Sequence, residues 1–458
     1  MGKVPRLLLC APASGGGKTT VTCALLQALV DRGAAPVAFK CGPDYIDPMF
    51  HSEVIGAKSR NLDLFLMGAG AVRRSLLENT RGGGVALIEG AMGYYDGIAL
   101  SSQASAYDLA RTTDTPAVLV ADIRGRALSA AALVRGMAEF RPDSQIRGVL
   151  LNRCSPMLYP RLRDAIQAET GLVVYGYFPD LPECSLESRH LGLVTAAEVT
   201  DLRDKLRRLA EQAERLVDLE GLLALAASAP ELEAPAPPPP ARREQRPILA
   251  LARDEAFCFY YADGLEELRR QGAELVEFSP LRDPALPEGA QGLYLGGGYP
   301  EVYARELSRN TSLLREIQGA VLHGMPTVAE CGGFLYLHRL LSDADGQYDW
   351  HMAGAFSGRA WNQGKLGRFG YITMAARNDG LLCGAGEALP AHEFHYWESE
   401  APGTAFRAQK PLSDRGWDCG WHTPTLYAGF PHFHFSGCPD AARRFVAACA
   451  RYERGKEG

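Results

Sequence analysis

The alternation of short, continuous apolar runs with stretches of helical period most constrains the fold of this chain. In the first half the apolar runs are RLLLCA, PVAFK, VALIEG, AVLVAD, GVLLNR and LVVYGYF. Strands that are apolar throughout need cover on both faces, as in a parallel sheet flanked by helices. The second half opens in the same way, with PILALARD, AELVEF, GLYLGGG and PTVAE. The sequence therefore predicts an α/β protein whose first half is a parallel sheet with helices on both faces.

A proline-rich segment divides the chain into two parts. Residues 231–247 read ELEAPAPPPPARREQRP, a composition that cannot build a core and favours a stiff, extended spacer. The length of 458 residues is enough for two domains with separate cores. We predict one domain over residues 1–230, a linker over 231–247 and a second domain over 248–458. Leucines at helical spacing predict a long helix that closes the first domain: Leu202, Leu206, Leu209, Leu216 and Leu219.

Composition argues against several classes of function. The formal net charge of −6 does not supply the basic field that nucleic-acid binding requires. No apolar run approaches the roughly 18 residues of a membrane span, and the short apolar stretch near the start runs into a glycine-rich loop, unlike a secretory signal. Eleven cysteines occur without paired spacing, which favours a reducing compartment. We expect a cytoplasmic protein with no nucleic-acid and no membrane partner.

A glycine-rich loop follows the first predicted strand and opens a helix. Its residues are Ser14, Gly15, Gly16, Gly17, Lys18, Thr19 and Thr20. Backbone N–H groups of such a turn point at phosphate oxygens, the lysine adds positive charge, and the hydroxyl of Thr19 can bind Mg²⁺. Pro12 stands where the strict motif has a glycine. The order of strand, turn and helix still favours an ATP site over a plain turn with a solvated lysine.

Acidic residues follow the next strands of the predicted sheet. Asp44 and Asp47 come shortly after PVAFK, which ends at Lys40, and Glu89 lies at the end of VALIEG. Ligands of open parallel sheets bind at this carboxyl edge. Because Mg²⁺ that bridges phosphates takes one or two carboxylates and a loop hydroxyl, we predict Thr19, Asp44 and Glu89 as its ligands. The alternative for a single carboxylate at such a place is a helix cap.

Other polar residues lie near the same predicted edge. Asp96 follows the strand that ends at Glu89, and Asn152 lies near the end of GVLLNR, where its amide could read adenine. Candidate partners for substrate carboxylates are Lys40, Arg60, Arg189 and His190. For each of those four, a solvated surface position is the alternative.

A single cysteine marks the second candidate site. Cys331 lies between the strand PTVAE and a helical pattern, and Gly332 and Gly333 follow it. A strand-to-helix turn exposes its apical residue, the geometry that nucleophiles of hydrolases use. The N–H of Gly332 can stabilise an oxyanion, and a second donor could come from residues 296–298. A cysteine is more often a buried apolar residue, but the strand and the two glycines favour a nucleophile.

A nucleophilic cysteine needs a base. His432 and His434 alternate with aromatic residues in LYAGFPHFHFSG, a probable strand. Spacing of two places both imidazoles on one face of that strand. Geometry from the sequence therefore leaves the choice between them open.

The order of the motifs resembles the family of cobyrinate a,c-diamide synthases, within the cobyrinate and cobyrate amidotransferase group. The resemblance covers nearly the whole chain. Its strings are SGGGKTT, FKCGPDYIDPMFH, RNLDLF, EGAMGYYDG, RHLGL, ARDEAFCFYY, LGGGYPE, AECGGFLYL, HEFHYW and HFHF. The strings GPDYIDPMFH and AECGGFLYL are highly specific, whereas the phosphate loop is shared with many ATPases.

The resemblance implies two cooperating activities. The first domain, similar to dethiobiotin synthetase, would bind Mg²⁺ and ATP and phosphorylate a substrate carboxylate. The second would be a class I glutamine amidotransferase-like α/β domain that releases ammonia from glutamine. Ammonia would displace phosphate, so that the a and c acetate groups of a tetrapyrrole, a corrinoid of cobalamin biosynthesis, become amides.

Family roles carry over to particular residues. They make Cys331 the nucleophile, favour His432 over His434 as its base, and place Asp96 near the substrate. Asp44 and Glu89 match the family's metal and ATP positions. Many class I amidotransferases continue their histidine motif as His-Pro-Glu, which supplies an orienting acid. Here Phe433 and His434 follow His432, so the resemblance names no third member of the site.

Three alternatives stay open at this point. Close relatives amidate hydrogenobyrinate or nickel-sirohydrochlorin by the same reaction. A reading from another class is a P-loop ATPase switch whose second domain is an inactive interaction module. The oligomeric state is also open, with a homodimer as one possibility.

Overall fold

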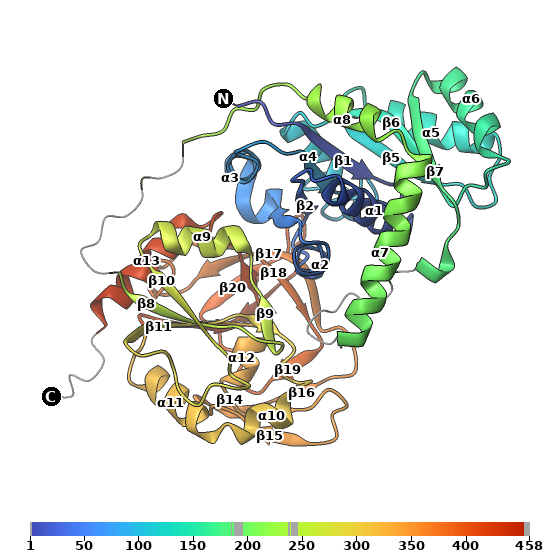
Figure 1. The fold of residues 1–458 in the computed structure, drawn as a ribbon. Coiled ribbons are helices and arrows are strands. Elements are labelled where there is room, and N and C mark those ends of the chain that lie inside the picture. Colours follow the sequence, from blue (N-terminus) through green and yellow to red (C-terminus); the bar gives the residue numbers. More distant parts are fainter. Residues whose placement is uncertain (1, 185, 187–195, 237–238, 240–245, 453–458) are drawn as a thin grey trace. The chain divides into compact units, whose positions relative to one another are not determined.

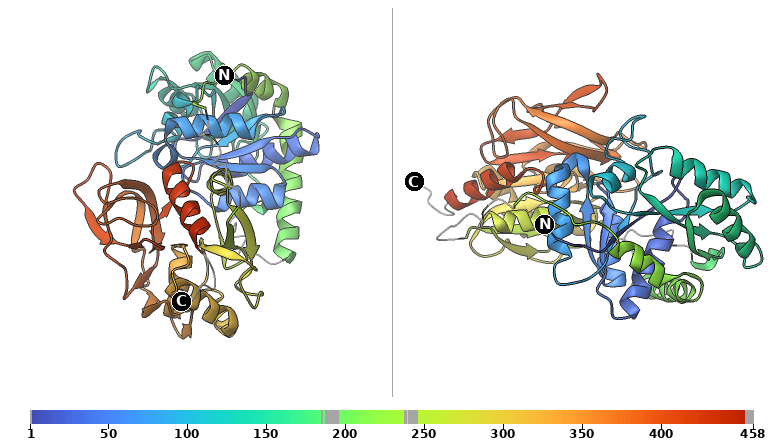
Figure 2. Two further views of the ribbon diagram at one scale, coloured as in Figure 1. Left: turned by 90° about the vertical axis from the view of Figure 1, so that its left-hand side faces the viewer. Right: turned by 90° about the horizontal axis from the view of Figure 1, so that it is seen from above.

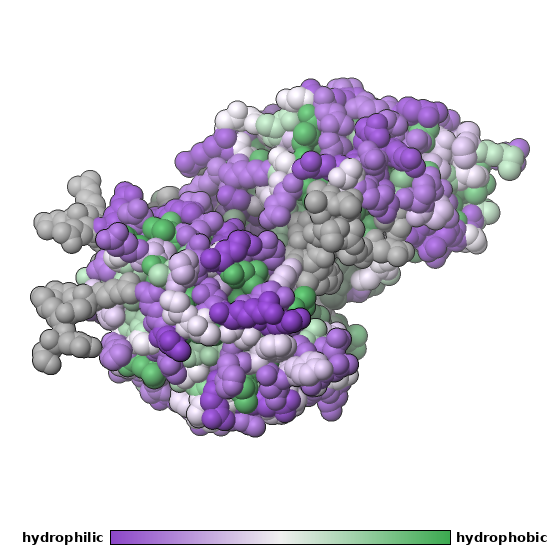
Figure 3. All heavy atoms as spheres, turned by 60° about the horizontal axis from the view of Figure 1, so that its bottom comes forward, coloured by the Kyte–Doolittle hydropathy of each residue, from purple (hydrophilic) through white to green (hydrophobic). Residues whose placement is uncertain are grey.

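The chain forms two compact units, Met1–Pro237 and Pro238–Gly458, which are described separately (Figure 1). The computed structural model describes residues 2–184, 186, 196–236, 239 and 246–452. Among these residues, no helix is long and apolar enough to cross a membrane. On the face shown in Figure 3, hydrophilic side chains dominate and hydrophobic ones occur singly or in small groups.

The first unit is built on a parallel sheet. Within the described residues it has seven strands in the order β3-β2-β4-β1-β5-β6-β7, and each neighbouring pair is parallel. The strands are β1 (Arg6–Cys10), β2 (Val37–Cys41), β3 (Lys58–Leu62), β4 (Ala86–Glu89), β5 (Ala117–Asp122), β6 (Ile146–Asn152) and β7 (Val173–Phe178). The continuous apolar runs predicted all but one of them.

The strand that the sequence analysis missed is β3, with the sequence KSRNL. It lies at the edge of the sheet, beside β2. An edge strand needs less apolar surface than a central one. Because β3 contains several polar residues, it does not form the continuous apolar run on which the strand predictions were based.

Helices connect the strands of the first unit. They are α1 (Lys18–Asp31), α2 (Ile46–Phe50), the π-helix η1 (His51–Ile55), α3 (Leu64–Asn79), α4 (Ala106–Thr112), α5 (Ser129–Glu139), α6 (Tyr159–Thr170), the 3₁₀ helix η2 (Pro182–Cys184), α7 (Ala196–Leu216) and α8 (Leu219–Ala227). Helices α1 and α7 lie side by side (Figure 2). Together with α8 they cover one face of the sheet and enclose a core that includes Leu9, Leu26 and Val118.

The predicted leucine stripe lies on two helices rather than one. Leu202, Leu206 and Leu209 are buried on α7, but α7 ends at Leu216 and Leu219 begins α8. The side chain of Asp218 accepts a hydrogen bond from Gly221 N at 2.8 Å and so caps α8. Leu219 is buried in the same core, whereas Leu216 is half-buried. The periodicity therefore predicted the buried face for four of the five leucines and missed the break between the helices.

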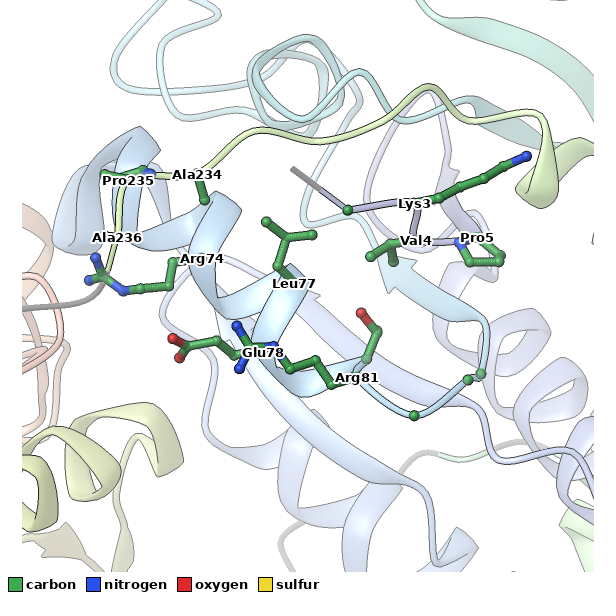
Figure 4. Close-up of a pocket in the computed structure, with 15 residues that line it drawn as sticks. Lys3, Val4, Pro5, Arg74, Leu77, Glu78, Arg81, Ala234, Pro235 and Ala236 are labelled. Carbon is green, nitrogen blue, oxygen red and sulfur yellow. The ribbon is translucent and has the colours of Figure 1, made fainter.

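The start of the predicted linker packs on the first unit. Leu232 is 2% exposed and pairs with Gly2, with hydrogen bonds of 3.1 Å and 3.0 Å between their backbones. A hollow of about 400 Å³ lies beside this contact (Figure 4). Its lining includes Lys3, Arg74 and Arg81. Since Lys3 precedes β1 and the glycine-rich loop follows it, the hollow lies at the amino edge of the sheet, opposite the phosphate loop.

The second unit combines a mixed sheet with smaller sheets. Its described residues include a six-stranded sheet in the order β10-β8-β11-β13-β23-β22, in which β22 pairs antiparallel and the other pairs are parallel. The other described sheets have the orders β12-β9, β15-β14-β16-β19 and β21-β20-β17-β18-β24. The parallel core confirms the prediction from PILALARD, AELVEF, GLYLGGG and PTVAE. Later strands such as β16 and β17 contain many exposed or half-buried residues, so they lack the continuous apolar runs of the parallel core.

The strands of this unit are β8 (Ile248–Ala252), β9 (Phe257–Phe259), β10 (Glu274–Phe278), β11 (Ala290–Leu295), β12 (Gly297–Gly298), β13 (Thr327–Glu330), β14 (His338–Ser342), β15 (Asp349–His351), β16 (Phe356–Asn362), β17 (Arg368–Ala376), β18 (Ala388–His395), β19 (Trp397–Ser399), β20 (Phe406–Gln409), β21 (Gly416–Cys419), β22 (Trp421–Thr423), β23 (Leu426–Gly429) and β24 (His432–Phe433). The helices are α9 (Ala262–Arg270), α10 (Ala304–Arg309), α11 (Thr311–Leu322), α12 (Gly332–Tyr336) and α13 (Pro439–Arg451). Helices α9 and α13 pack together in Figure 1.

Candidate active sites

The glycine-rich loop joins β1 to α1 at the carboxyl edge of the first sheet. Gly15 and Gly17 have φ angles of +76° and +90°, a backbone conformation that favours glycine. A Cβ atom on Gly17 would lie 2.0 Å from Asn152 Nδ2, so a larger residue cannot stand there. Helix α1 begins at Lys18, as predicted.

Two side chains from the end of β6 hold this loop. Asn152 Nδ2 donates to Gly16 O at 3.0 Å, and Arg153 Nη1 donates to Gly15 O at 3.3 Å. Arg153 also contacts Asp122 Oδ2 at 2.8 Å. Asn152 was predicted from the sequence as a nucleotide contact, whereas no role was predicted for Arg153. The contact of Asn152 with the loop is a tethering one, and adenine recognition by its amide stays a prediction.

Lys18 lies within the loop rather than in solvent. It is 8% exposed, and its Nζ donates to Ala13 O at 3.1 Å and to Met92 O. Burial and the nearby charge of Lys40 lower the pKa of Lys18. The cation is thus held against the loop, where phosphate oxygens bind in such turns.

A buried cluster of charges lies next to the loop. Thr19 Oγ1 donates to Glu89 Oε1 at 2.5 Å, and Lys40 Nζ lies 2.7 Å from the same oxygen. Lys40 also donates to Asp47, and His51 Nε2 lies 3.5 Å from Glu89 Oε2. Burial opposes the charged form of Glu89, but Lys40 and His51 overcome it and lower the pKa of that carboxyl. Glu89 is therefore held as a carboxylate beside the phosphate loop.

Asp44 serves as a helix cap and also faces the cluster. Its Oδ1 accepts hydrogen bonds from Ile46 N at 2.8 Å and Asp47 N at 3.2 Å, the alternative that the sequence analysis had weighed. Its Oδ2 lies 3.9 Å from Lys40 Nζ. The hydroxyl of Thr19 and the carboxylates of Glu89 and Asp44 are oxygen donors of the kind that a hard cation such as Mg²⁺ prefers.

The described residues contain no ready-made metal site. In the described parts of the chain, no group of three or more His, Cys, Asp or Glu side chains is close enough to hold a metal ion. The predicted set has two carboxylates and a hydroxyl, and such a set relies on phosphate oxygens to complete the coordination shell. The Mg²⁺ assignment therefore stays a prediction about the nucleotide complex.

The other residues predicted for this site are Asp96, Arg60, Arg189 and His190. Asp96 is exposed, and its Oδ2 accepts a hydrogen bond from Gly93 N at 3.1 Å. Its charge raises the pKa of Lys18, so it lies near the loop lysine. Arg60 lies on β3 and donates to Ser59 O at 2.7 Å. Arg189 and His190 lie outside the described residues.

Cys331 occupies the turn between β13 and α12. Its φ of +46° and ψ of −101° are strained for a residue with a side chain, as at the nucleophile turns of hydrolases. Its N–H donates to Gly429 O at 2.8 Å, and its carbonyl accepts from Leu335 N at 2.9 Å. The thiol is neither fully buried nor fully exposed. The strained turn confirms the predicted geometry at this position.

The structure distinguishes the two candidate histidines. Cys331 and Glu330 interact with His432, and although burial alone would lower the pKa of this imidazole, those partners raise it to about 10. His434 stacks on Tyr261 with ring centres 4.6 Å apart, and burial lowers its pKa to about 4. His432 is thus the histidine that the fold brings to the thiol.

The predicted strand through both histidines is wrong in one respect. Strand β24 contains His432 and Phe433, and it ends before His434. The backbone turns there, since Gly437 N and Cys438 N both donate to His434 O. The two imidazoles therefore have different neighbours, although a spacing of two in a continuous strand would place them on one face.

Glu330 is the residue of this site that the sequence analysis missed. Its Oε2 lies 3.1 Å from His432 Nδ1, and both side chains are buried. The signal was present in AECGG, because an acid that ends an apolar parallel strand and directly precedes the cysteine is unusual in a core.

Glycines bring the backbone of β12 close to the site. A Cβ atom on Gly297 would lie 2.6 Å from His432 Cε1, and one on Gly332 would lie 3.0 Å from Gly298 N. Gly296 N donates to Tyr260 at 2.9 Å, so that N–H is engaged elsewhere. Among the three predicted glycines, Gly298 has the N–H that lies nearest to the turn after Cys331.

Comparisons with known proteins match both units. Residues 7–194 match the CobQ/CobB/MinD/ParA nucleotide binding domain, and residues 248–439 match the CobB/CobQ-like glutamine amidotransferase domain. A cobyrinate a,c-diamide synthase from Caldanaerobacter subterraneus is 37% identical over 98% of this chain and 99% of its own length. The enzyme of that name from Salmonella typhimurium is 37% identical over 97% of this chain and 98% of its own.

A third relative is named for a different substrate. The hydrogenobyrinate a,c-diamide synthase of Thermobifida fusca is 40% identical, over 97% of each chain. All three similarities cover 97% or more of this chain, and therefore extend over both units. On this full-length similarity and on the two matched domains, the chain belongs to the a,c-diamide synthase family of glutamine-dependent amidotransferases that includes the cobyrinate enzymes.

Proposed function

We propose that this protein converts the a and c acetate carboxylates of cobyrinate into amides, using ATP and glutamine, in cobalamin biosynthesis. The observation that carries the proposal is the full-length similarity to relatives that bear this name. The predicted domain over residues 1–230 would activate the carboxylate, and the predicted domain over residues 248–458 would supply ammonia.

The charged loop of the first unit supports carboxylate activation. A carboxylate resists attack by ammonia because its carbonyl carbon is electron-rich, and phosphorylation of one oxygen turns that oxygen into a leaving group. The loop from Ser14 to Thr20 would hold the phosphates of ATP through its N–H groups and Lys18. Thr19, Asp44 and Glu89 would hold Mg²⁺, which neutralises phosphate charge when bound. Asp96, beside the loop, is the proposed contact to the substrate.

The cysteine turn of the second unit supports glutamine hydrolysis. The thiolate of Cys331 would attack the carboxamide carbon of glutamine, and imidazolium His432 would give its proton to the departing ammonia. Water would then cleave the thioester and release glutamate. The N–H groups of Gly332 and Gly298 are the proposed donors to the oxyanion.

The names of the relatives leave hydrogenobyrinate as a second candidate substrate. The relative that is 40% identical is named for hydrogenobyrinate, the metal-free ring. Nickel-sirohydrochlorin stays a further alternative. Incubation of the purified protein with each tetrapyrrole, Mg·ATP and glutamine, followed by product mass, decides among them. Two added amide groups on cobyrinate alone would support the proposal, and amidation of another ring alone would overturn the choice of substrate.

Replacement of the nucleophile tests the division of labour. The Cys331→Ala variant should lose glutamine-dependent amidation and keep amidation driven by free ammonia, because the first unit accepts ammonia from either source. Cys258→Ala, which changes another partly exposed cysteine of the same unit, is the matched control. Equal loss of both reactions in Cys331→Ala alone would contradict the proposed roles.

The alternative function, a P-loop ATPase switch with an inactive second domain, is not favoured by the second unit. Such a module has no need to bring Cys331 and His432 together, and the family assignment covers the second unit as well. A thiol-alkylating glutamine analogue should inactivate the protein, whereas a switch would keep its ATPase activity unchanged. A cytoplasmic location and a homodimer stay predictions, which fractionation and light scattering would test.

A further inference from the structure

We propose that Glu330 is the third member of the glutaminase site, a positioning residue that orients His432 and favours its protonated form. This inference rests on the proposed glutaminase function of the second unit. It departs from the His-Pro-Glu arrangement, in which the acid follows the histidine by two residues. Here the acid directly precedes the nucleophile, and the position two residues after His432 is His434.

The distance and burial of the pair support this role. Glu330 Oε2 lies 3.1 Å from His432 Nδ1, and the two residues are 1% and 3% exposed. A buried carboxylate and a buried imidazole would each lose solvation free energy without a partner. A hydrogen bond from Nδ1–H to the carboxylate satisfies both groups and leaves Nε2 as the ring nitrogen that can serve the thiol.

The other oxygen of Glu330 is also held. Tyr294, which lies on the neighbouring strand β11, donates its hydroxyl hydrogen to Glu330 Oε1 at 3.2 Å. Tyr294 is 4% exposed. Because both oxygens have partners from different strands, the carboxylate cannot rotate freely, and it transmits a fixed orientation to the imidazole.

The acid and the nucleophile of this site are adjacent in the sequence. Glu330 ends β13, and the strained turn at Cys331 leads directly into α12. Successive residues of an extended strand point to opposite faces, but at this turn both side chains reach the same imidazole. The strained φ of Cys331 therefore aims the thiol and lets the preceding acid act on the same base.

The groups around this pair fix the expected electrostatic effect. His432 faces Glu330 at the end of β13, Cys331 in the turn that follows, and His392 on β18, and its charge also acts on His395. Glu330 faces Tyr294 as well. Burial raises the pKa of Glu330, while the hydrogen bond and charge of His432 and the hydrogen bond from Tyr294 oppose that rise. The ionised carboxylate stabilises imidazolium, and imidazolium beside a thiol favours the thiolate. Removal of the charge should weaken both ionised forms together.

The test replaces the charge while keeping the shape. Glu330→Gln should lower the kcat for glutamine hydrolysis on the order of 100-fold, because the imidazole of His432 loses both its fixed orientation and the charge that favours its protonated form. The pH profile for alkylation of Cys331 by iodoacetamide should move up by about one pH unit or more, since the thiolate loses its cation. Amidation from free ammonia should stay at the wild-type rate. A purely structural role would not move the alkylation profile.

Two variants make the outcome decisive. Glu393→Gln removes another carboxylate of the same unit that is 0% exposed, and it should leave glutaminase and the alkylation profile unchanged. Glu330→Asp keeps the charge on a shorter arm and should recover part of the lost rate. If Glu330→Gln hydrolyses glutamine within about threefold of the wild type and its alkylation profile is unmoved, the inference is wrong. If Cys331→Ala also retained glutaminase activity, the proposed function itself would fail.

Discussion

The close approach of Gly297 to His432 makes a sharp prediction. A Cβ atom at Gly297 would lie 2.6 Å from His432 Cε1, whereas ordinary contacts begin near 3.4 Å. The difference between these two distances is 0.8 Å, so Gly297→Ala should push the imidazole away by about that amount. A displacement near 1 Å at a catalytic group costs on the order of 100-fold in rate. We expect glutamine hydrolysis to fall by about that factor.

The assay compares glutamate release with amidation from free ammonia. Only the first reaction uses the imidazole, so Gly297→Ala should slow glutamate release and spare ammonia-driven synthesis. Gly319→Ala is the matched control, because it lies inside α11 and its nearest atom, His323 Nδ1, would be 3.9 Å from the new Cβ. That change should be neutral or slightly stabilising.

The reasoning would be refuted by either of two results. Full glutaminase activity in Gly297→Ala, with an unchanged melting temperature, would show that the imidazole does not need this close backbone. Equal loss of both reactions would show that the added methyl group disturbs the fold and not the site.

Three further perturbations follow from the structure. Glu89→Gln should lower ATP-dependent amidation at least about 100-fold while part of the glutaminase activity persists, and unchanged amidation would remove Glu89 from the nucleotide site. Arg6→Met should lower the free energy of unfolding of the first unit by at least about 3 kcal/mol. Arg6 is 0% exposed, and its guanidinium donates to four backbone carbonyls, those of Val4, Thr113, Asp114 and Pro230. A melting temperature within about 2 °C of the wild type would contradict this prediction. The pKa of His432 is raised in the folded protein to about 10, so its protonation stabilises the fold fully below about pH 6.5, and this contribution is lost as the pH rises towards 10. The melting temperature of wild type should therefore exceed that of His432→Gln by more at pH 6 than at pH 10, and a constant difference would count against the raised pKa.

The elements that the sequence predicted well are those with strong local signals. The apolar runs located six of the seven described strands in the first sheet, and the glycine-rich loop located the start of α1 at Lys18. The strand β3 was missed because its edge position relaxes the need for apolar residues. The long leucine-rich helix was predicted as continuous, since periodicity reports the buried face and is blind to a local cap such as Asp218.

The residues of the candidate sites also fall into two groups, those that local motifs predicted and those that only the fold brings together. Motifs located Lys18, Thr19, Glu89 and Cys331, because phosphate loops and nucleophile turns need particular residues at adjacent positions. The partners of those residues come from distant parts of the chain. Glu330 and His432 are 102 positions apart. No local pattern states that they meet.

The sequence by itself thus determined the two α/β units, the loop for phosphates and the turn that carries the thiol, since each depends on short-range geometry and on the burial of apolar runs. Only the tertiary structure decided that His432 and not His434 reaches Cys331, that Lys40 lies buried among carboxylates, and that Glu330 contacts the imidazole. The physical reason is that side-chain partners are chosen by strand order and register, and these result from packing the whole sheet rather than from any one segment.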